Sequence, residues 1–256
     1  MKASIDINGV GYHVDLNDPL DISIPLKAGT GRASAWYVDG IAIDPVRTDE
    51  FTGSVKEGGS VNFRTISFNP HGNGTHTECL GHITPEVYSV NQSIKKYFSI
   101  VKVITIQPEV GFNDPEFSSD KDLILSKNAI EDALKGELTE SIILRTLPNA
   151  DDKEEKNWSE SNWPQLDKEA AKWFAEQGVK NVLIDLPSVD RENDGGKLLS
   201  HHAFWNVPEN PRMDASITEM IYVPNEIEDG KYFLEIQFAP FENDASPSRP
   251  VLYRFL

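Results

Sequence analysis

Five of the six histidines in this chain fall into two groups, and the first group contains a glutamate. The first group occupies twelve residues and comprises His71, His76, Glu78 and His82. The second group is the adjacent pair His201 and His202. Imidazole and carboxylate side chains together suit zinc, manganese or iron. The sequence therefore predicts a divalent metal site, with Zn or Mn as the expected ion. A solvated loop with scattered histidines is the alternative, and it explains one histidine better than this cluster.

The spacing of the first group allows its side chains to converge. His76 and Glu78 are two residues apart, so on a strand they point to the same face. His71 lies five residues before His76, which on a straight strand is the opposite face. The intervening Gly72-Asn73-Gly74 can fold the chain back, because Gly and Asn tolerate positive φ. His82 follows Gly81, where we expect a bend.

Two later positions carry further ligand-type side chains. Glu219 shares a predicted strand face with Ile217 and Ile221, and a carboxylate there is costly unless it is paired or bound to metal. An Arg or Lys partner is the alternative. His201 and His202 are adjacent and cannot point the same way on a helix or a strand. We expect one of them at the site and the other in packing.

The first group lies in a recognisable motif. Gly74-Thr75-His76-Thr77-Glu78, followed by His82, resembles the cyclase-like metal-dependent hydrolases, which include bacterial kynurenine formamidase and isatin hydrolase. The motif of that family is His-x-Gly-Thr-His-x-Asp-x-Pro-x-His. This chain has Glu78 in place of the Asp and Leu80 in place of the Pro. The leading histidine falls on Gly72, whereas this chain has a histidine one residue earlier, at His71.

The resemblance continues in order along the chain. Its further segments are Asp21-Ile22-Ser23-Ile24-Pro25-Leu26, Leu144-Arg145-Thr146, Asp185-Leu186-Pro187-Ser188-Val189-Asp190, the strand with Glu219, and Ala245-Ser246-Pro247-Ser248-Arg249. The resemblance alone marks Asp185, Ser188 and Asp190, for which loop-capping hydrogen bonds are an equal alternative. We expect Arg145 to form a buried salt bridge.

The resemblance implies a metal-dependent enzyme that hydrolyses a non-peptide amide, either a formamide such as N-formylkynurenine or a cyclic amide. The predicted metal ligands for one or two ions are His71, His76, Glu78 and Glu219. The predicted catalytic residues are His82, as general acid and base, and His201, as a metal ligand or its neighbour. The resemblance also implies a homodimer or higher oligomer. Two alternatives stay open: a non-catalytic small-molecule-binding protein on the same fold, and an enzyme acting on cyclic esters.

We expect an aromatic substrate pocket, formed by Trp158, Trp163, Phe204 and Trp205. Residues 149–163 lack periodicity and are long for a connection, which predicts a lid or a wall of the site. An equal alternative is that this segment is a solvated acidic loop, which its tryptophans merely attach to the rest of the domain. Cys79 has odd separations from His76 and His82, so we expect a small buried hydrophobe rather than a nucleophile.

The elements that must position these residues are mostly strands. Residues 98–106 are nearly continuous in β-branched residues, which is typical of a strand buried on both faces. Further strands are expected over residues 21–25, 60–68, 141–147, 182–187, 217–223 and 232–239, and helices over residues 127–134 and 166–177. The predicted class is α/β or α+β, with a mixed β-sheet core flanked by helices. The resemblance implies the swivelling β/β/α cyclase-like fold.

Composition limits the remaining possibilities. The 256 residues carry a net charge of −17, so we expect no nucleic acid or anionic membrane partner. No linker divides the chain, which predicts one domain over residues 1–256. No apolar run approaches the ~20 residues of a membrane helix, and a single cysteine is typical of a reducing, cytoplasmic location. The sequence contains neither Gly-x-Ser-x-Gly nor Gly-x-Gly-x-x-Gly.

Overall fold

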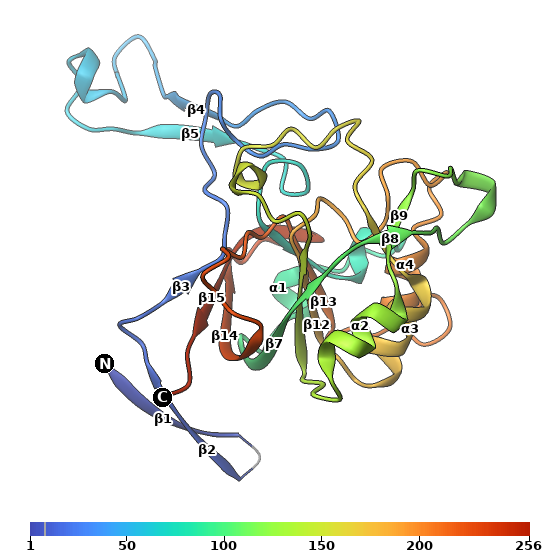
Figure 1. The fold of residues 1–256 in the computed structure, drawn as a ribbon. Coiled ribbons are helices and arrows are strands. Elements are labelled where there is room, and N and C mark those ends of the chain that lie inside the picture. Colours follow the sequence, from blue (N-terminus) through green and yellow to red (C-terminus); the bar gives the residue numbers. More distant parts are fainter. Residues whose placement is uncertain (8) are drawn as a thin grey trace.

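A closed β-barrel forms the centre of the molecule. The computed structural model describes residues 1–7 and 9–256. The main sheet runs in the order β14 (Gly230–Phe238), β7 (Phe98–Ile106), β10 (Ser141–Thr146), β12 (Asn181–Ile184), β13 (Ser216–Glu219), β6 (His76–Glu78), β15 (Ala245–Tyr253) and β3 (Leu20–Asp21). Pairing of β14 with β15 closes the first seven strands into a barrel (Figure 1).

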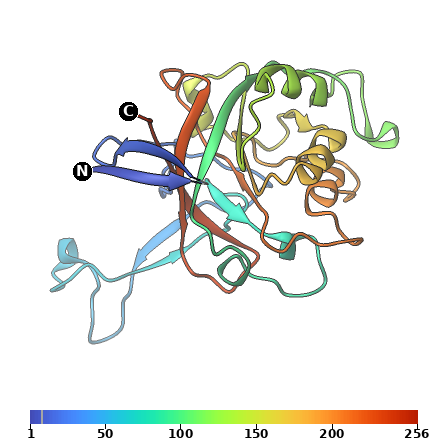
Figure 2. The same cartoon turned by 90° about the horizontal axis from the view of Figure 1, so that it is seen from below.

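The sheet is mixed, as the sequence predicts. β7, β10, β12 and β13 are parallel to one another, and the remaining neighbours pair antiparallel. The chain crosses between the parallel strands through α2 (Lys127–Leu134), α3 (Lys168–Glu176) and α4 (Leu199–Trp205). These helices lie together on one side of the barrel in both views (Figure 2). The predicted mixed sheet flanked by helices is therefore confirmed.

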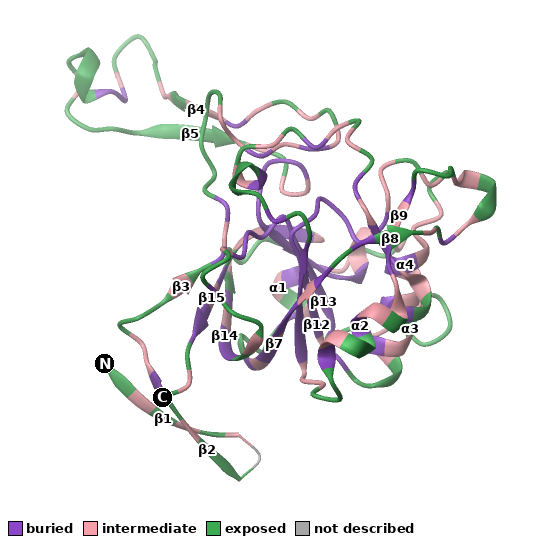
Figure 3. Cartoon of the chain, viewed as in Figure 1, coloured by how far each residue is buried: buried purple, intermediate pink, exposed green. Residues whose placement is uncertain are grey.

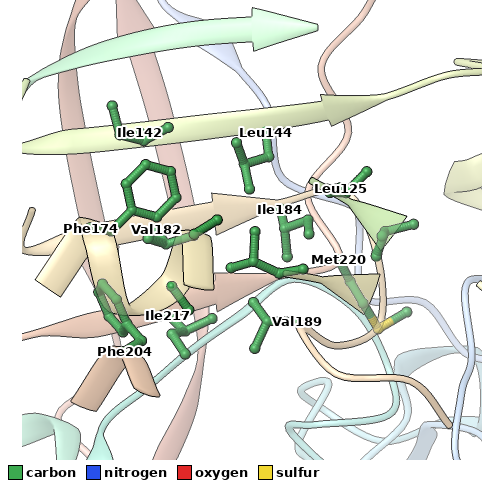
Figure 4. Close-up of a cluster of buried hydrophobic side chains, with 14 of the residues drawn as sticks. Leu125, Ile142, Leu144, Phe174, Val182, Ile184, Val189, Phe204, Ile217 and Met220 are labelled. Carbon is green, nitrogen blue, oxygen red and sulfur yellow. The ribbon is translucent and has the colours of Figure 1, made fainter. Parts of the chain in front are cut away.

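Alternating side chains of the parallel strands build two apolar layers. On β10, Ile142 and Leu144 belong to the cluster that packs against the helices, whereas Ile143 belongs to the cluster with residues of β14 and β15. This alternation follows from the twofold period of a strand. Phe174 of α3 and Phe204 of α4 fill the space between the helices and the strands (Figure 4). Both faces of β10 are therefore buried.

The helices begin where the sequence supplies caps. The Ser126 hydroxyl accepts a hydrogen bond from the backbone N–H of Ala129 at the start of α2. The Asp167 carboxylate does the same for Glu169 at the start of α3, and Gly178, with φ of 80°, follows its end. The predicted helix over residues 166–177 begins two residues late, because Gln165–Leu166 forms a short strand.

That short strand, β11 (Gln165–Leu166), completes a small sheet with β9 (Leu123–Leu125) and β8 (Glu109–Val110). The remaining helices are single turns. They are α1 (Val90–Ser93), η1 (Val55–Glu57), η2 (Leu80–His82), η3 (Pro115–Phe117) and η4 (Asp151–Glu154). Along residues 1–7 and 9–256, no helix has the length and apolar character to cross a membrane.

Two hairpins project from the side of the barrel away from the helices. They are β1 (Lys2–Ile7) with β2 (Val10–Asp15), and β4 (Ala42–Pro45) with β5 (Arg64–Ser67). Most of the β4–β5 arm is exposed (Figure 3). The strand predicted over residues 60–68 is wrong in extent: only Arg64–Ser67 is a strand, and all four residues are exposed because no core covers the arm.

We predict that Phe174→Ala lowers the free energy of unfolding by about 3–5 kcal/mol, because it leaves a cavity between α3 and the sheet. Chemical denaturation measures this change. Lys172→Ala, on the exposed face of the same helix, should change stability by less than about 0.5 kcal/mol. Equal losses in the two variants would contradict the packing described here.

Candidate metal centre

Strand β6 brings two of the predicted ligands into the barrel wall. It lies between β13 and β15, and all its residues are buried. His76 pairs in register with Glu219, whereas Glu78 pairs with Ile217 on β13 and with Ala245 on β15. Directly opposite residues of an antiparallel pair lie side by side, so the register alone brings Glu219 to His76.

β13 ends at Glu219, earlier than the strand predicted over residues 217–223. Met220 has a φ of 53°, which takes the chain out of the extended conformation. The Glu219 side chain turns into the cluster, and its Oε1 accepts a hydrogen bond from the backbone N–H of Val189 at 2.9 Å. Its Oε2 lies 3.4 Å from His76 Nε2.

A tight loop before β6 delivers His71. The Asn69 side chain accepts a hydrogen bond from the backbone N–H of Gly72, and the Asn73 side chain accepts one from the backbone N–H of Asn69. Gly72 packs against a neighbouring segment: a Cβ there would lie 2.5 Å from a Val38 methyl and 2.9 Å from the Ala35 carbonyl oxygen. Position 72 therefore has no room for a side chain, and the imidazole comes from position 71.

The Glu78 carboxylate divides its two oxygens between two imidazoles. Oε2 lies 3.2 Å from His71 Nδ1, and Oε1 lies 3.1 Å from His201 Nε2. The His82 Nδ1 atom is 3.9 Å from Oε2. The Glu78 side chain itself has 0% exposure. Glu78 is thus the centre of the cluster.

His201 enters the cluster from the first turn of α4, which Asp190 anchors. The two Asp190 oxygens accept hydrogen bonds from the backbone N–H groups of Ser200 and His201, which are free at a helix start. Asp190 Oδ2 also lies 2.7 Å from His201 Nδ1. The ring is therefore fixed with Nε2 facing Glu78. His202 instead points its Nδ1 to the Val207 carbonyl, so the structure brings His201, and not His202, to the site.

His82 and an aspartate form the more exposed edge of the cluster. His82 ends the short helix η2, and it follows Gly81, where an added Cβ would collide with the Tyr88 carbonyl. The predicted bend at Gly81 is therefore present. Asp244, just before β15, places Oδ2 at 2.9 Å from His71 Nε2 and at 3.3 Å from His82 Nδ1. Sequence reasoning missed Asp244.

The chemistry of the donor set fits a divalent ion. His76 Nδ1 donates to the Gly74 carbonyl at 3.0 Å, so its Nε2 carries a lone pair. Within the described residues, neither this Nε2 nor Glu78 Oε2 forms a hydrogen bond of good geometry, although both atoms are buried; Glu219 Oε2 and His71 Nδ1 approach them without that geometry. Buried polar atoms are rarely left unsatisfied. Ligand atoms of His71, His76 and Glu78 lie within 4.8 Å of one another, and so do those of Glu78, His82 and His201.

Without a metal, protons supply the positive charge. Burial lowers the pKa of His71, but the adjacent carboxylates of Asp244 and Glu78 outweigh it and raise that pKa to about 10. Burial also lowers the pKa of His201. Hydrogen bonds with Asp190 and Glu78 outweigh this effect and raise that pKa well above its usual value. Burial raises the pKa of Glu78, but the charge of His82 and the hydrogen bond from His201 hold it well below its usual range.

Comparison with known proteins agrees with this architecture. The sequence profile of a family described as putative cyclases matches residues 20–191, about two thirds of the chain. The chain belongs to this family. Among curated proteins, none matches the sequence.

Solved structures of similar fold cover nearly the whole chain. A "predicted metal-dependent hydrolase" from Bacillus stearothermophilus is 16% identical, with a TM-score of 0.60, and the match covers 92% of this chain and 98% of that one. Isatin hydrolase A from Labrenzia aggregata is 13% identical, with a TM-score of 0.63 and coverage of 92% and 93%. An isatin hydrolase bound to the product analogue thioisatinate is 14% identical, with a TM-score of 0.63 and coverage of 93% of each chain. At these identities the likeness shows a shared fold.

The aromatic residues predicted for a substrate pocket are buried in the core. Trp158, Trp163, Phe204 and Trp205 are all buried in the core cluster beside the helices. Trp163 donates its indole N–H to the Asp190 carbonyl at 2.9 Å, and Trp205 donates to Ala215 at 3.0 Å. Their rings therefore support the loops behind the cluster and offer little free surface. Both tryptophans of residues 149–163 pack into the body, as the alternative of an acidic loop attached by its tryptophans expects, and the lid or wall over these residues stays a prediction.

Three other residues singled out in the sequence make structural contacts. Cys79 is buried, with its thiol 3.5 Å from the Tyr88 carbonyl, as predicted for a small buried residue. Arg145 pairs with Asp229 at 2.8 Å, which confirms a salt bridge of a buried arginine. Asp185 pairs with Lys153 at 2.7 Å and accepts the Thr146 backbone N–H.

We predict that metal uptake at pH 7.5 releases at least one proton per chain. The pKa of His71 is raised to about 10 in the metal-free protein, whereas an imidazole ligand must be neutral, and the raised pKa of His201 acts in the same direction. Metal affinity should therefore rise as the pH is raised toward 10. Calorimetry in buffers of different ionisation enthalpy counts the protons. His202→Gln should release the same number, and a value of zero in the wild-type protein would refute the charge state described here.

We predict that Gly72→Ala weakens the site without unfolding the barrel. The added methyl collides with the Ala35 carbonyl and with Val38, so the loop that holds His71 must shift. We expect a lower melting temperature and weaker Zn²⁺ binding. Gly11→Ala is the matched control, because a Cβ at position 11 has nothing within 4 Å. Wild-type Zn²⁺ affinity in Gly72→Ala would show that the loop tolerates the shift.

Proposed function

We propose that this chain is a metal-dependent hydrolase of small non-peptide amides, either formamides such as N-formylkynurenine or cyclic amides. The observation that carries the proposal is a pair of buried atoms that lack hydrogen bonds of good geometry, His76 Nε2 and Glu78 Oε2, at the centre of a cluster of four imidazoles and several carboxylates. Membership of the cyclase family and the fold shared with isatin hydrolases add support.

Zn or Mn is the proposed ion. His71 Nδ1, His76 Nε2 and Glu78 Oε2 would hold it, because ligand atoms of these three residues converge within 4.8 Å of one another. His201 Nε2 and Glu219 Oε1, which lie 3.7 Å apart beside Glu78 Oε1, would complete the set or hold a second ion. A divalent ion in such a site lowers the pKa of a water molecule and polarises a substrate carbonyl.

His82 is the proposed general acid and base. Its side chain is 29% exposed at the edge of the cluster, whereas His76 and Glu78 are fully buried. It therefore sits where substrate and water arrive, next to the proposed ligands. As a base it would take the proton of the attacking water, and as an acid it would give a proton to the leaving nitrogen. Together, these two steps break the C–N bond of the substrate and form one carboxylate and one amine.

The buried floor of the cluster would exclude bulk water from the reacting carbonyl. His76, Glu78, His201 and Glu219 have almost no exposure, and Trp205 packs on His201 with ring centroids 5.4 Å apart. Electrostatic interactions are stronger in such a dry environment. The substrate would thus contact the site from the side of His71, His82 and Asp244.

A panel of substrates tests the proposal. The zinc- or manganese-loaded protein should hydrolyse N-formylkynurenine or a cyclic amide such as isatin, and the chelated protein should not. A lactone in the same panel detects an enzyme acting on cyclic esters. A loaded protein that binds these compounds without turnover would instead be a binding protein, and the proposal would be wrong.

We predict that two histidine variants separate metal binding from proton transfer. His76→Ala should lose the metal, because it removes a proposed ligand. His82→Ala should keep the metal but lower kcat by about 10²–10⁴-fold, as expected for loss of a general acid and base. Elemental analysis and kinetics measure both properties, and His202→Ala should change neither. If His82→Ala loses metal as fully as His76→Ala, then His82 is itself a ligand.

A further inference from the structure

Asp244 contacts two imidazoles at the more exposed edge of the cluster. Its Oδ2 atom is 2.9 Å from His71 Nε2 and 3.3 Å from His82 Nδ1. The two rings are stacked, with centroids 4.4 Å apart and an interplanar angle of 29°. One carboxylate oxygen therefore contacts the ring of a proposed ligand and the ring of the proposed acid and base at the same time.

The backbone places Asp244 independently of these imidazoles. Its carbonyl accepts a hydrogen bond from the Cys79 N–H at 3.0 Å, and the Asn243 carbonyl accepts one from the Val90 N–H at 2.9 Å. These bonds attach the segment before β15 to the end of β6 and to the start of α1. The carboxylate is thus held in place by the same strand that carries Glu78.

A neutral imidazole has one N–H, and a hydrogen bond at one nitrogen decides which nitrogen can bind a metal. If His71 Nε2 donates to Asp244, its lone pair lies on Nδ1, the atom that faces Glu78 Oε2 at 3.2 Å. If His82 Nδ1 donates to the same oxygen, its lone pair lies on Nε2 and is free to take a proton from water. Both tautomers are the ones that the proposed chemistry requires.

The other side of the cluster has the same arrangement. Asp190 Oδ2 accepts from His201 Nδ1 at 2.7 Å and leaves Nε2 facing Glu78 Oε1. Carboxylates that orient ligating histidines in this way are common behind metal sites. The resemblance seen in the sequence marks Asp190, but no motif marks Asp244.

On this basis we propose that Asp244 is a positioning residue, which fixes the tautomer and the orientation of both His71 and His82. The inference rests on the proposed function in its assignment of roles to these two histidines. Ligand atoms of His71, His82 and Asp244 also lie within 4.8 Å of one another, but the orientation of His71 favours positioning over direct ligation by Asp244. His71 turns its two nitrogens to opposite carboxylates, and as a neutral ring it can bind an ion through only one of them. The Nδ1 side faces the buried cluster with the partnerless atoms.

We predict that Asp244→Ala weakens binding of Co²⁺ to the chelator-stripped full chain by about 10- to 100-fold, with unchanged stoichiometry. Visible absorption follows the titration and reports the ligand field, so an altered cobalt spectrum is also expected. Asp244→Asn keeps the shape and one hydrogen-bond acceptor, and its affinity should fall between those of Asp244→Ala and the wild type. With a confirmed substrate, Asp244→Ala should lower kcat more than it changes KM.

Asp214→Ala is the control, because Asp214 pairs with Lys180 on the surface at 2.7 Å and should leave Co²⁺ affinity unchanged. If Asp244→Ala does not fold, as judged by thermal melting, Asp244→Asn alone decides, and wild-type affinity and spectrum in that variant would refute the inference. Loss of one full equivalent of Co²⁺ from Asp244→Ala would also refute it and make Asp244 a ligand. A wild-type protein that binds Co²⁺ but hydrolyses no amide overturns the proposed function, whereas the Co²⁺ comparison still decides the role of Asp244.

Discussion

A carboxylate without access to water lies in the wall of the barrel, and much of the surrounding structure compensates for its burial. Transfer of an unpaired Glu78 carboxylate out of water would cost several kcal/mol. His71, His201 and His82 surround it from three different segments, and its pKa is held well below its usual range. Burial raises the energy of the negative charge, and this makes the cluster a strong site for any cation, whether proton or metal.

The barrel supplies the precision that this cluster requires. β6 is only three residues long, yet it has a neighbour on each side, so His76 and Glu78 cannot shift their register without breaking two ladders. The imidazoles that come from outside the strand are held differently. Asp190 fixes His201 at the start of a helix, and Asp244 contacts His71 and His82 from the loop before β15. Strand register and the carboxylates of Asp190 and Asp244 thus share the task.

Local patterns predicted the longest parallel strand and a helix that packs on the sheet. The strand Phe98–Ile106 and the helix Lys127–Leu134 agree with the sequence-based prediction, because hydrophobic periodicity and caps act locally. The β4–β5 arm does not agree with its prediction. Residues 60–68 alternate as a half-buried strand does, but no hydrophobic core packs against them. Convergence of His71 with His76 follows from glycines in the loop. Asp244 lies 173 residues from His71, and no short-range signal connects them.

The same separation governs how the protein is made. At about 5–20 residues per second, the ribosome needs roughly 10–35 s after the segment with His71 to produce the one with Asp244. During that interval β6 lacks its β15 neighbour, since contacts of long sequence separation form late. The nascent chain therefore presents histidines and a glutamate in an unpaired strand, and only closure of the barrel turns them into a rigid site.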